Sequence, residues 1–468
     1  MITYLKLHGY RSLNNFEMEL HKGLNILIGP NGAGKSNIVS FFSFLSFVMT
    51  QSLPEAISKL GGAGAFFQKR AAGTFFDEVS ASVWGSVRFP DPQPGQPTMH
   101  RFSPSSFDYC YQFTIKASPD FSAISFVDEQ LRMKERKALD SIGDRALEHD
   151  EVCDFVLTKV LDATGRQSSA HVRKWKAVHA PHIIQPPPAL PDPNLEQKQN
   201  ATLHQQVQGF VRPETSIVST AMHVFPWLQA LRQDFTGGEI FNIIPNAAKA
   251  SDDSATPPGI RSDGGGLAAT LYRLSLPAQS PQFPFFQPLS RFEYLVPDKA
   301  AAFKRVERLL KLINSSFEQL SVNNDPFDNR IKVTVQIRTE DGPIDLPFAS
   351  MSDGTAKWLA LITAIATSGS IFAIEEPENF LHPLMQQEIA ELMRETTENR
   401  PTPSLVLMTT HSETLLNVTR PDEVVVIHMV EGITRAKRPE DSATLQSIIS
   451  ETGFGLGHLY ITGGLANA

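Results

Sequence analysis

The sequence predicts an α/β fold in which a mixed sheet is accompanied by an antiparallel β lobe and a largely helical insertion. A short apolar run, Leu24–Ile28, stops at Gly29 as a buried strand feeding a loop should, and residues 37–51 follow with the apolar pattern of a helix packed on a sheet. From about residue 74 to 131 the pattern changes to short runs rich in Val, Phe, Tyr and Ile, which are typical of antiparallel strands. The final third alternates strand and helix patterns, and this order predicts a parallel sheet.

In the N-terminal part, residues 2–13 alternate loosely and contain β-formers, which predicts a first strand ending near Arg11 and Ser12. The β lobe is predicted to contain three strands, joined in part by the Pro/Gly-rich segment 90–98: Thr74–Val87, Phe107–Ala117 and Phe121–Met133.

The middle of the chain predicts irregular segments and a few helices. Residues 184–193 are proline-rich and indicate a polyproline or irregular stretch. Helices are predicted from about Pro226 to Phe235, near 267–275 and over 300–320. The last of these places six apolar side chains on one face at helical spacing: Phe303, Val306, Leu309, Leu310, Ile313 and Phe317.

The last third predicts the remainder of the core. Its strands and helices alternate as follows: strand Lys332–Arg338, a helix from Thr355, strand Ile371–Ile374, a helix from Pro383, strand Ser404–Met408, a short helix after Ser412 and strand Glu423–His428. We therefore expect a core built from residues 1–132 and 325–440, interrupted by an insertion of mixed helix and loop at 133–324 and followed by an extension at 441–468.

Bulk properties exclude several classes of protein. The net charge of −8 tells against a surface that coats nucleic acid everywhere, although it leaves a local basic groove open. No apolar run approaches the roughly 20 residues needed to span a bilayer, and the N-terminus lacks the pattern of a signal peptide. Cys110 and Cys153 predict neither a disulfide framework nor a zinc site. We expect a cytoplasmic protein with no membrane association.

The glycine-rich loop reads Gly29-Pro30-Asn31-Gly32-Ala33-Gly34-Lys35-Ser36. In a loop of this kind free backbone N–H groups cradle phosphate oxygens, and the helix that begins there adds the positive end of its dipole. Lys35 is predicted to reach the β- and γ-phosphates of ATP, and the Ser36 hydroxyl to hold Mg²⁺. The loop therefore predicts a P-loop NTPase fold with ATP and Mg²⁺ as cofactors.

Two carboxylates follow the predicted strand that begins at Ile371. In a P-loop protein one acid at this point binds the hydrated metal and the next orients the attacking water, so Glu375 is the candidate metal ligand and Glu376 the candidate catalytic group. Most P-loop proteins have Asp at the first position, so Glu375 is a departure with a longer side chain. Capping of the next helix is the structural alternative for the pair.

Two further segments complete the candidate site. A buried strand pattern ends at His411, whose neutral imidazole can hydrogen-bond the γ-phosphate. Ser352, Asp353 and Gly354 precede a helix, and a hydroxyl with free N–H groups at a helix N-terminus can bind phosphate. Because the P-loop already occupies the phosphates within one chain, this second site is expected to contact the nucleotide of another protomer.

The order of these motifs (P-loop, Ser-Asp-Gly-Thr, Glu-Glu-Pro-Glu-Asn-Phe-Leu-His-Pro, Thr-Thr-His-Ser) resembles the RecF/SMC/OLD-like branch of ABC-type ATPases. More narrowly it is similar to the AAA-family ATPases found beside effector genes in bacterial anti-phage systems. Three further segments also look like that group: Asn31 and Asn37 around the P-loop, Tyr10–Leu13, and Ser262–Gly266.

The resemblance implies an ABC-type fold and a mechanism shared between two chains. It implies that Asn37 joins the nucleotide site, that Ser352 and Gly354 act across a head-to-head dimer, that Glu376 is the catalytic glutamate and that His411 is the switch histidine. Residues 379–382 would lie in the loop at the dimer interface. Gln68 and Gln130 both stay open as the glutamine that couples nucleotide to the second lobe. No Toprim domain is expected, so any nuclease would be a separate subunit.

Three functions remain open at this stage. The first is an ATPase that dimerises around ATP, or forms a higher even-numbered homo-oligomer, and serves as a sensor, clamp or regulator for DNA, RNA or a separate nuclease or toxin effector in anti-phage defence or DNA repair. Basic clusters at 68–70, 132–137 and 173–176 are its candidate contacts. The second is the nucleotide-binding subunit of a membrane transporter, which the long insertion fits poorly. The third is a scaffold that binds ATP without hydrolysis.

Overall fold

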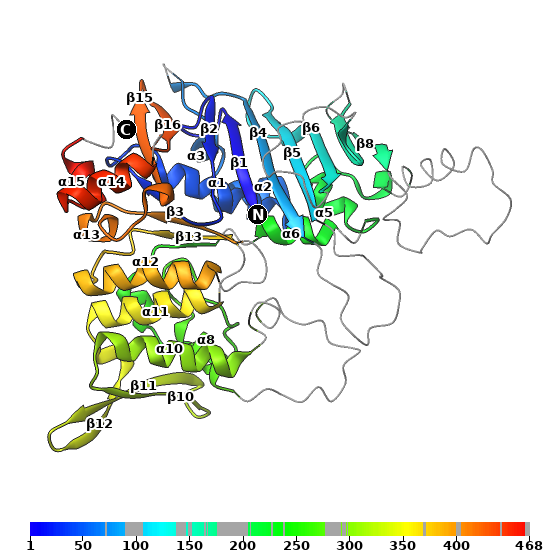
Figure 1. Cartoon of the computed structure of the whole chain (residues 1–468). Helices are drawn as coiled ribbons and strands as arrows, with labels where there is room; N and C mark the ends of the chain where they lie inside the picture. Colours follow the sequence, from blue (N-terminus) through cyan, green and yellow to red (C-terminus); the bar gives the residue numbers. More distant parts are fainter. Residues whose placement is uncertain are drawn as a thin grey trace.

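The computed structural model of the chain places the described residues in three sheets with helices between and beside them (Figure 1). It describes residues 1–70, 73–88, 106–136, 147, 152–162, 165, 167–175, 205, 207–225, 228–236, 239–276, 292, 296, 298–367, 371–398, 404–439 and 442–463. The predicted loop at 90–98 and the proline-rich stretch at 184–193 lie outside these residues.

The β lobe is an antiparallel sheet with the order β2-β1-β4-β5-β6-β7-β8. Its strands are β1 (Ile2–His8), β2 (Phe16–Glu19), β4 (Glu78–Arg88), β5 (Ser106–Ala117), β6 (Ile124–Glu135), β7 (Phe155–Leu161) and β8 (Ser168–Trp175). The three strands predicted for this lobe are confirmed as β4, β5 and β6. Strands β7 and β8 were not predicted, and they extend the same sheet beyond residue 135.

The first strand is shorter than predicted. It ends at His8, because the chain turns immediately afterwards: Gly9 has φ 76 and Arg11 has φ 48. A Cβ atom on Gly9 would lie 2.2 Å from the backbone oxygen of Glu78, so the close approach to β4 also requires glycine at this turn. Arg11 and Ser12 therefore lie in a loop beside the P-loop and not in a strand.

The second sheet carries the predicted nucleotide site. Its order is β16-β15-β3-β14-β13-β9, and all neighbours are parallel except β15 and β16. The strands are β3 (Gly23–Ile28), β9 (Glu239–Phe241), β13 (Ile371–Glu375), β14 (Leu405–Thr409), β15 (Val424–Val430) and β16 (Ile433–Lys437). The carboxyl ends of parallel strands meet at one edge, so the residues that follow β3, β13 and β14 come together there.

This sheet is buried on both faces, which explains its continuous apolar strands. Along β14, Leu405 and Leu407 pack into one core, while Val406 and Met408 pack into the other. The first core lies between this sheet and the β lobe, around α1 (Lys35–Val48). The second core packs the opposite face against helices and a small third sheet (Figure 1).

The remaining elements surround these two cores. The third sheet is antiparallel, with β10 (Phe317–Asp325), β11 (Arg330–Thr339) and β12 (Gly342–Pro347). The other α-helices are α2 (Leu53–Lys59), α3 (Ala63–Phe66), α5 (Ile217–Ala221), α6 (Leu228–Thr236), α7 (Pro245–Lys249), α8 (Leu267–Ser275), α10 (Lys299–Ile313), α11 (Asp353–Thr367), α12 (Pro383–Glu398), α13 (Glu413–Leu416), α14 (Ser442–Thr452) and α15 (Leu456–Ile461). Short 3₁₀ turns cover Phe348–Ser350 and Pro421–Glu423. In the part of the chain that is described, no helix is long and apolar enough to cross a membrane.

The helix predicted over 300–320 is too long at its C-terminal end. α10 ends at Ile313, and Phe317 begins β10. Phe317 continues the helical spacing because it enters the same core that α10 covers, although it does so from a strand. Periodicity therefore identified the burial of Phe317 correctly and its secondary structure incorrectly.

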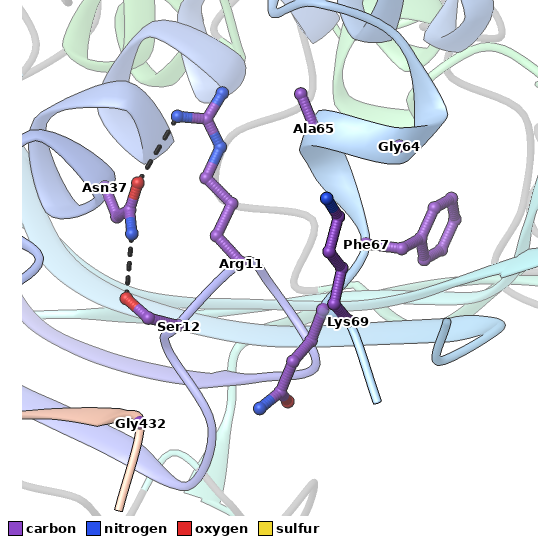
Figure 2. A pocket seen from close by; sticks show the side chains of 9 residues that line it. Arg11, Ser12, Asn37, Gly64, Ala65, Phe67, Lys69 and Gly432 are labelled. Carbon is purple, nitrogen blue, oxygen red and sulfur yellow. Dashed lines mark hydrogen bonds between the residues drawn. The ribbon is translucent and has the colours of Figure 1, made fainter. Parts of the chain in front are cut away.

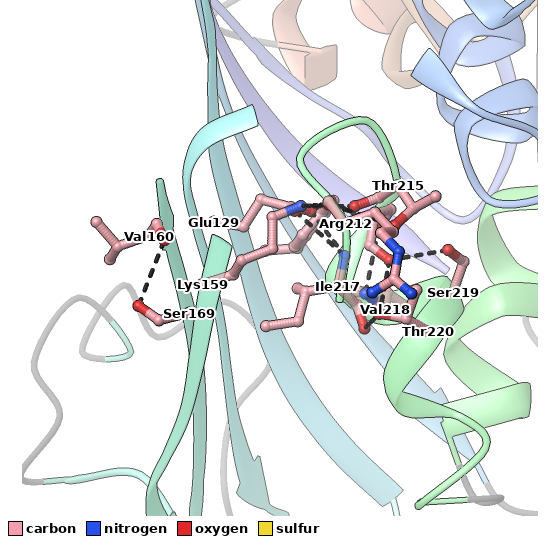
Figure 3. Close-up of polar contacts among 12 residues, drawn as sticks. Glu129, Lys159, Val160, Ser169, Arg212, Thr215, Ile217, Val218, Ser219 and Thr220 are labelled. Atoms are coloured by element: carbon pink, nitrogen blue, oxygen red, sulfur yellow. Dashed lines mark hydrogen bonds and ion pairs between the residues drawn. The ribbon is translucent and has the colours of Figure 1, made fainter. Parts of the chain in front are cut away.

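A buried ion pair joins the β lobe to the segment before α5. Lys159 on β7 and Glu129 on β6 pair with both side chains fully buried (Figure 3). Glu129 also accepts hydrogen bonds from the Tyr111 hydroxyl at 2.6 Å and the Ile217 backbone N–H at 3.0 Å. Lys159 donates to the carbonyl oxygen of Thr215. The network therefore fixes residues of the predicted insertion against the sheet.

Candidate functional site

The P-loop runs from the end of β3 to the start of α1, as predicted. Two of its glycines are required by close contacts with the β15–β16 hairpin. A Cβ atom on Gly29 would lie 2.0 Å from the carbonyl oxygen of Ile427, and one on Gly34, which has φ 100, would lie 2.0 Å from the Thr434 hydroxyl oxygen. That hydroxyl also donates to the carbonyl oxygen of Ala33 at 2.9 Å. The hairpin therefore holds the loop from one side, while Asn31, Gly32 and Ser36 are exposed.

Lys35 lies almost buried beneath the loop, with 7% of its surface exposed. Its Nζ atom donates to the carbonyl oxygens of Gly29 at 2.8 Å and Pro30 at 3.2 Å, and it lies 2.8 Å from Nε2 of His411. Burial lowers the pKa of Lys35 from its ordinary value, and the nearby carboxylates of Glu376, Glu378 and Glu375 oppose this shift. The ammonium group therefore faces the carboxyl ends of β13 and β14.

The two predicted acids lie where β13 ends. Glu375 is the last residue of the strand, and Glu376 adopts φ 42, a left-handed conformation that is unusual for a residue with a side chain. The Glu376 N–H donates to the backbone oxygen of Thr409 at 3.0 Å, and its Oε2 accepts from Nδ2 of Asn379 at 2.9 Å. The Glu376 side chain is part-exposed at 43%, and its Oε1 lies 4.0 Å from Nε2 of His411. These contacts direct the carboxylate toward Lys35 and His411.

Sequence reasoning missed the role of Glu378. Its Oε1 atom accepts hydrogen bonds from the Thr410 hydroxyl at 2.9 Å and from the His411 backbone N–H at 2.8 Å. It therefore sets the position of the loop that carries the predicted switch histidine. The signal was present as the third acid in the Glu-Glu-Pro-Glu segment, but spacing alone does not distinguish it from a surface carboxylate.

His411 is held in the site as a partly exposed imidazole. Burial and the Lys35 ammonium lower its pKa from 6.5, and the carboxylates of Glu376 and Glu378 oppose this. Neutral imidazole is the form that can accept a hydrogen bond from Lys35 at Nε2. Lys35, Glu375, Glu376 and His411 are thus brought together by the structure, as the sequence predicted.

The Ser352–Gly354 segment lies elsewhere in the monomer. The Ser352 Oγ atom accepts from the backbone N–H of Thr355 at 3.2 Å and so caps α11. Ser352 and Asp353 are exposed, and Asp353 pairs with Lys249 of α7 at 2.6 Å. Within the described part of the chain, no hydrogen bond or ion pair connects this segment to the P-loop of the same molecule.

A pocket of about 420 Å³ adjoins the N-terminal turn of α1. The Arg11 side chain lies between Asn37 and the segment that carries Ala65, Phe67 and Lys69 (Figure 2). Arg11 donates to Oδ1 of Asn37 at 3.4 Å, and Asn37 donates to the Ser12 hydroxyl at 2.8 Å. Among the described residues, Nε of Arg11 has no hydrogen-bond partner although it is buried. Polar groups and one aromatic ring therefore line a hollow next to the P-loop.

The two candidate glutamines are separated by the fold. Gln68 lines this pocket, and its buried Oε1 has no hydrogen-bond partner among the described residues. Gln130 lies in the middle of β6, opposite Gln112 and Thr158 of the neighbouring strands. Of the basic clusters, Lys69 and Arg70 lie over the rings of Phe75 and Phe76.

Residues 132–135 of the second basic cluster lie on β6, and residues 173–175 of the third lie on β8. Arg132 and Arg136 bind Gln112 and Asp108 of β5. The side chains of the cluster at 173–176 lie outside the described residues.

Comparisons with known proteins match both ends of the chain. Residues 4–82 match an AAA-domain family, and residues 266–417 match the family described as "AAA domain, putative AbiEii toxin, Type IV TA system". A segment of 50 residues is 38% identical to the DNA double-strand break repair Rad50 ATPase of Methanopyrus kandleri, covering 11% of this chain and 6% of that protein.

Solved structures of SMC heads are also similar. One is an SMC head bound to the C-terminal winged-helix domain of ScpA, with 12% identity, coverage of 93% of this chain and 97% of that chain, and a TM-score of 0.46. Another is the Smc head from Pyrococcus furiosus with an extended coiled coil, bound to the C-terminal domain of ScpA, with 12% identity, coverage of 96% and 99%, and a TM-score of 0.42.

The two family matches divide between the two parts of the site. The match over 4–82 contains the P-loop, and the match over 266–417 contains Ser352–Gly354, the Glu375–Glu376 pair and His411. Both parts meet at the carboxyl edge of one mixed sheet, where Lys35, Glu376 and His411 converge. The chain is thus similar to AAA-domain families over the two segments that form this site.

Proposed function

We propose that the protein binds ATP and Mg²⁺ on the P-loop and hydrolyses ATP between two copies of the chain. The observation that carries this proposal is the convergence of Lys35, Glu376 and His411 at one sheet edge. The loop residues fit a triphosphate because the exposed Asn31 and Gly32 leave backbone N–H groups accessible beside the Lys35 ammonium. The pocket lined by Arg11, next to the start of α1, is the proposed place of the nucleoside.

In this proposal each residue has one task. Ser36 and Glu375 hold Mg²⁺, which neutralises charge on the phosphates when bound. Lys35 binds the β- and γ-phosphates, and Glu376 orients the attacking water and accepts its proton. His411 donates a hydrogen bond from an imidazole N–H to the γ-phosphate. Asn379 and Thr409 keep Glu376 in place through the hydrogen bonds described above.

The partner chain is proposed to supply Ser352, Asp353 and Gly354. Support comes from the exposure of Ser352 and Asp353 and from the lack of any described contact between this segment and the P-loop of the same molecule. Phe380 and Leu384, on the neighbouring loop and α12, have 64% and 66% of their surfaces exposed. Large apolar side chains exposed beside a polar site are typical of an interface that forms on ligand binding.

The biological role is proposed by similarity. One segment resembles a Rad50 repair ATPase, and another matches a family whose description names a toxin–antitoxin system. Both similarities support a role as a sensor, clamp or regulator that acts on nucleic acid or on a separate effector. Anti-phage defence or DNA repair in the cytoplasm is the proposed setting. Lys69, which lines the Arg11 pocket, and its neighbour Arg70 are the proposed basic contacts.

Mixing two inactive variants tests the shared site. Lys35→Ala removes the phosphate ligand, and Ser352→Arg blocks the segment proposed to act on the partner's nucleotide. Each variant alone is expected to lack ATP turnover. A heterodimer of the two contains one intact composite site, so an equimolar mixture should regain roughly a quarter of wild-type turnover if the chains exchange freely. A mixture that stays inactive while exchange is demonstrated would place both segments in one chain's site and reject the shared mechanism.

A further inference from the structure

Lys357 is a buried cation on a helix that is otherwise largely apolar. It lies in the first turns of α11, shortly after Ser352–Gly354, and only 1% of its surface is exposed. Its Nζ atom donates to the backbone oxygen of Glu376 at 3.0 Å and lies 5.9 Å from the centre of the Phe380 ring. The helix that begins with the exposed phosphate-binding candidate therefore contacts the predicted catalytic residue directly.

Burial of this ammonium group works against stability. It lowers the pKa of Lys357 to about 8, while the carboxylates of Glu378 and Glu376 oppose the shift. A buried charge is usually no more stabilising than an apolar side chain of the same shape, so a methionine would fill this position at least as well if packing were its only task. Packing alone therefore does not explain a lysine at this position, and its role is to be sought in the contacts that it makes with the site.

The backbone of Glu376 is the group that Lys357 holds. Glu376 has φ 42, which a side-chain-bearing residue keeps only where its surroundings enforce it. Its N–H is bound by Thr409 of β14, and its carbonyl oxygen is bound by Lys357 of α11. The conformation is thus fixed from the sheet on one side and from α11 on the other.

A second contact ties the same loop to the start of α11. A Cβ atom on Gly354 would lie 2.9 Å from the backbone oxygen of Phe380, so the loop that follows Glu376 packs closely on the helix N-terminus. In addition, Oε2 of Glu378 is buried and has no hydrogen-bond partner within the described part of the chain.

We propose that Lys357 is a positioning residue that sets the conformation of Glu376 from α11, so that engagement of Ser352–Gly354 with the partner's nucleotide aligns the water-activating carboxylate of the same chain. This inference rests on the proposed function of the site. It assigns Lys357 to the catalytic step and not to nucleotide binding, since its Nζ atom contacts the backbone of Glu376.

Lys357→Met tests the proposal through steady-state kinetics. We expect kcat to fall about tenfold or more while the KM for ATP and the binding of a fluorescent ATP analogue change by less than about threefold. The melting temperature should stay the same or rise, because a desolvated charge is removed. Thr363→Val, which alters an equally buried polar group on the same helix, is the matched control and should leave kcat unchanged. Unchanged kcat in Lys357→Met, or a fall that accompanies loss of binding and of thermal stability, would overturn the proposal.

Hydrogen exchange supplies a readout that needs no turnover. In the nucleotide-free protein, Lys357→Met should speed hydrogen exchange of the backbone amides of Glu376 and residues 378–381, while the amides of β14 keep their rates. Equal rates in the 376–381 loop would reject a positioning role. If the wild type itself hydrolyses no ATP, the proposed function fails, and the exchange rates still decide whether Lys357 holds Glu376.

Discussion

The Nζ atom of Lys35 lies 2.8 Å from Nε2 of His411, which joins the P-loop to the loop after β14. Because an ammonium group can only donate hydrogen bonds, Nε2 of His411 acts as the acceptor and the imidazole is neutral. The carbonyl oxygens of Gly29 and Pro30 accept the other bonds of Lys35. In the proposed function, a bound phosphate would compete with these three acceptors for the Lys35 ammonium group.

The first prediction concerns stability and pH. Because the pKa of His411 is lowered from 6.5 in the folded protein, the unfolded chain binds more protons below that pH. Folding is therefore disfavoured progressively as the pH falls through 6.5 and below. His411→Gln should lose less stability than the wild type between about pH 7.5 and about pH 5.5, measured by urea unfolding. The same loss in both proteins would show that His411 does not titrate as the geometry indicates.

The second prediction separates binding from hydrolysis at Glu376. Glu376→Gln keeps the shape and the Asn379 contact but cannot accept a proton, so ATP should still bind while turnover falls by roughly two orders of magnitude. Size-exclusion chromatography with ATP should then show accumulation of a dimer. Glu388→Gln on the exposed side of α12 is the control and should behave as wild type. Wild-type turnover in Glu376→Gln would assign the water to another group.

The sequence predicted which segments would meet at the candidate site, but not all of the contacts that hold them there. Strands β3, β13 and β14 contain continuous apolar runs and are followed within two residues by Gly29, Glu376 and His411, so local pattern and residue type were sufficient to place these residues. The contacts of Glu378 and Lys357 were not predicted, because each joins segments whose proximity depends on the packing of α11 on the sheet.

The β lobe shows a second reason why part of the fold could not be predicted from the sequence. Strand β7 contains Lys159, and β8 begins with two serines, so the segment was interpreted as a polar part of the insertion. Burial of Lys159 depends on Glu129, which lies 30 positions earlier in the chain and on the neighbouring strand. Alternation of polar and apolar residues cannot reveal a charge that is paired inside the lobe.

The third prediction concerns the charge of the segment proposed to face the partner's nucleotide. Asp353 would repel a triphosphate, and Lys249, which lies 2.6 Å away with 17% of its side chain exposed, offsets that charge. Lys249→Ala should therefore raise the KM for ATP, by about three- to tenfold for a charge pair at a partly exposed site. Asp353→Asn should restore the KM of Lys249→Ala, because it removes the unbalanced carboxylate.

The double variant also distinguishes this electrostatic role from a purely structural role of the ion pair. The Lys249–Asp353 pair could instead serve only to connect α7 to α11. In that case Asp353→Asn alone should lower the thermal stability as much as Lys249→Ala does, and the double variant should recover neither the stability nor the KM. Thermal unfolding of the single and double variants, run beside the kinetics, separates the two cases.

The last prediction concerns the fully buried pair of Glu129 and Lys159. Burial lowers the pKa of Lys159, and Glu129 opposes this shift, so removal of the carboxylate leaves an ammonium group without its counter-charge. Glu129→Ala should lower the free energy of unfolding by about 3–5 kcal/mol in urea titrations. Asp77→Ala is the control: its 3.9 Å contact with Lys116 is about half exposed, and its loss should cost less than about 1 kcal/mol.

Replacing both members of the buried pair shows what the charges contribute. Glu129→Leu combined with Lys159→Met should recover most of the stability lost in Glu129→Ala, because two apolar side chains of similar volume need no counter-charge. The Tyr111 hydroxyl and the Ile217 N–H would lose an acceptor, so recovery should stop short of the wild type by about 1–3 kcal/mol. A double variant less stable than Glu129→Ala would show that these hydrogen bonds, and not the ion pair, fasten the 212–217 segment to the β lobe.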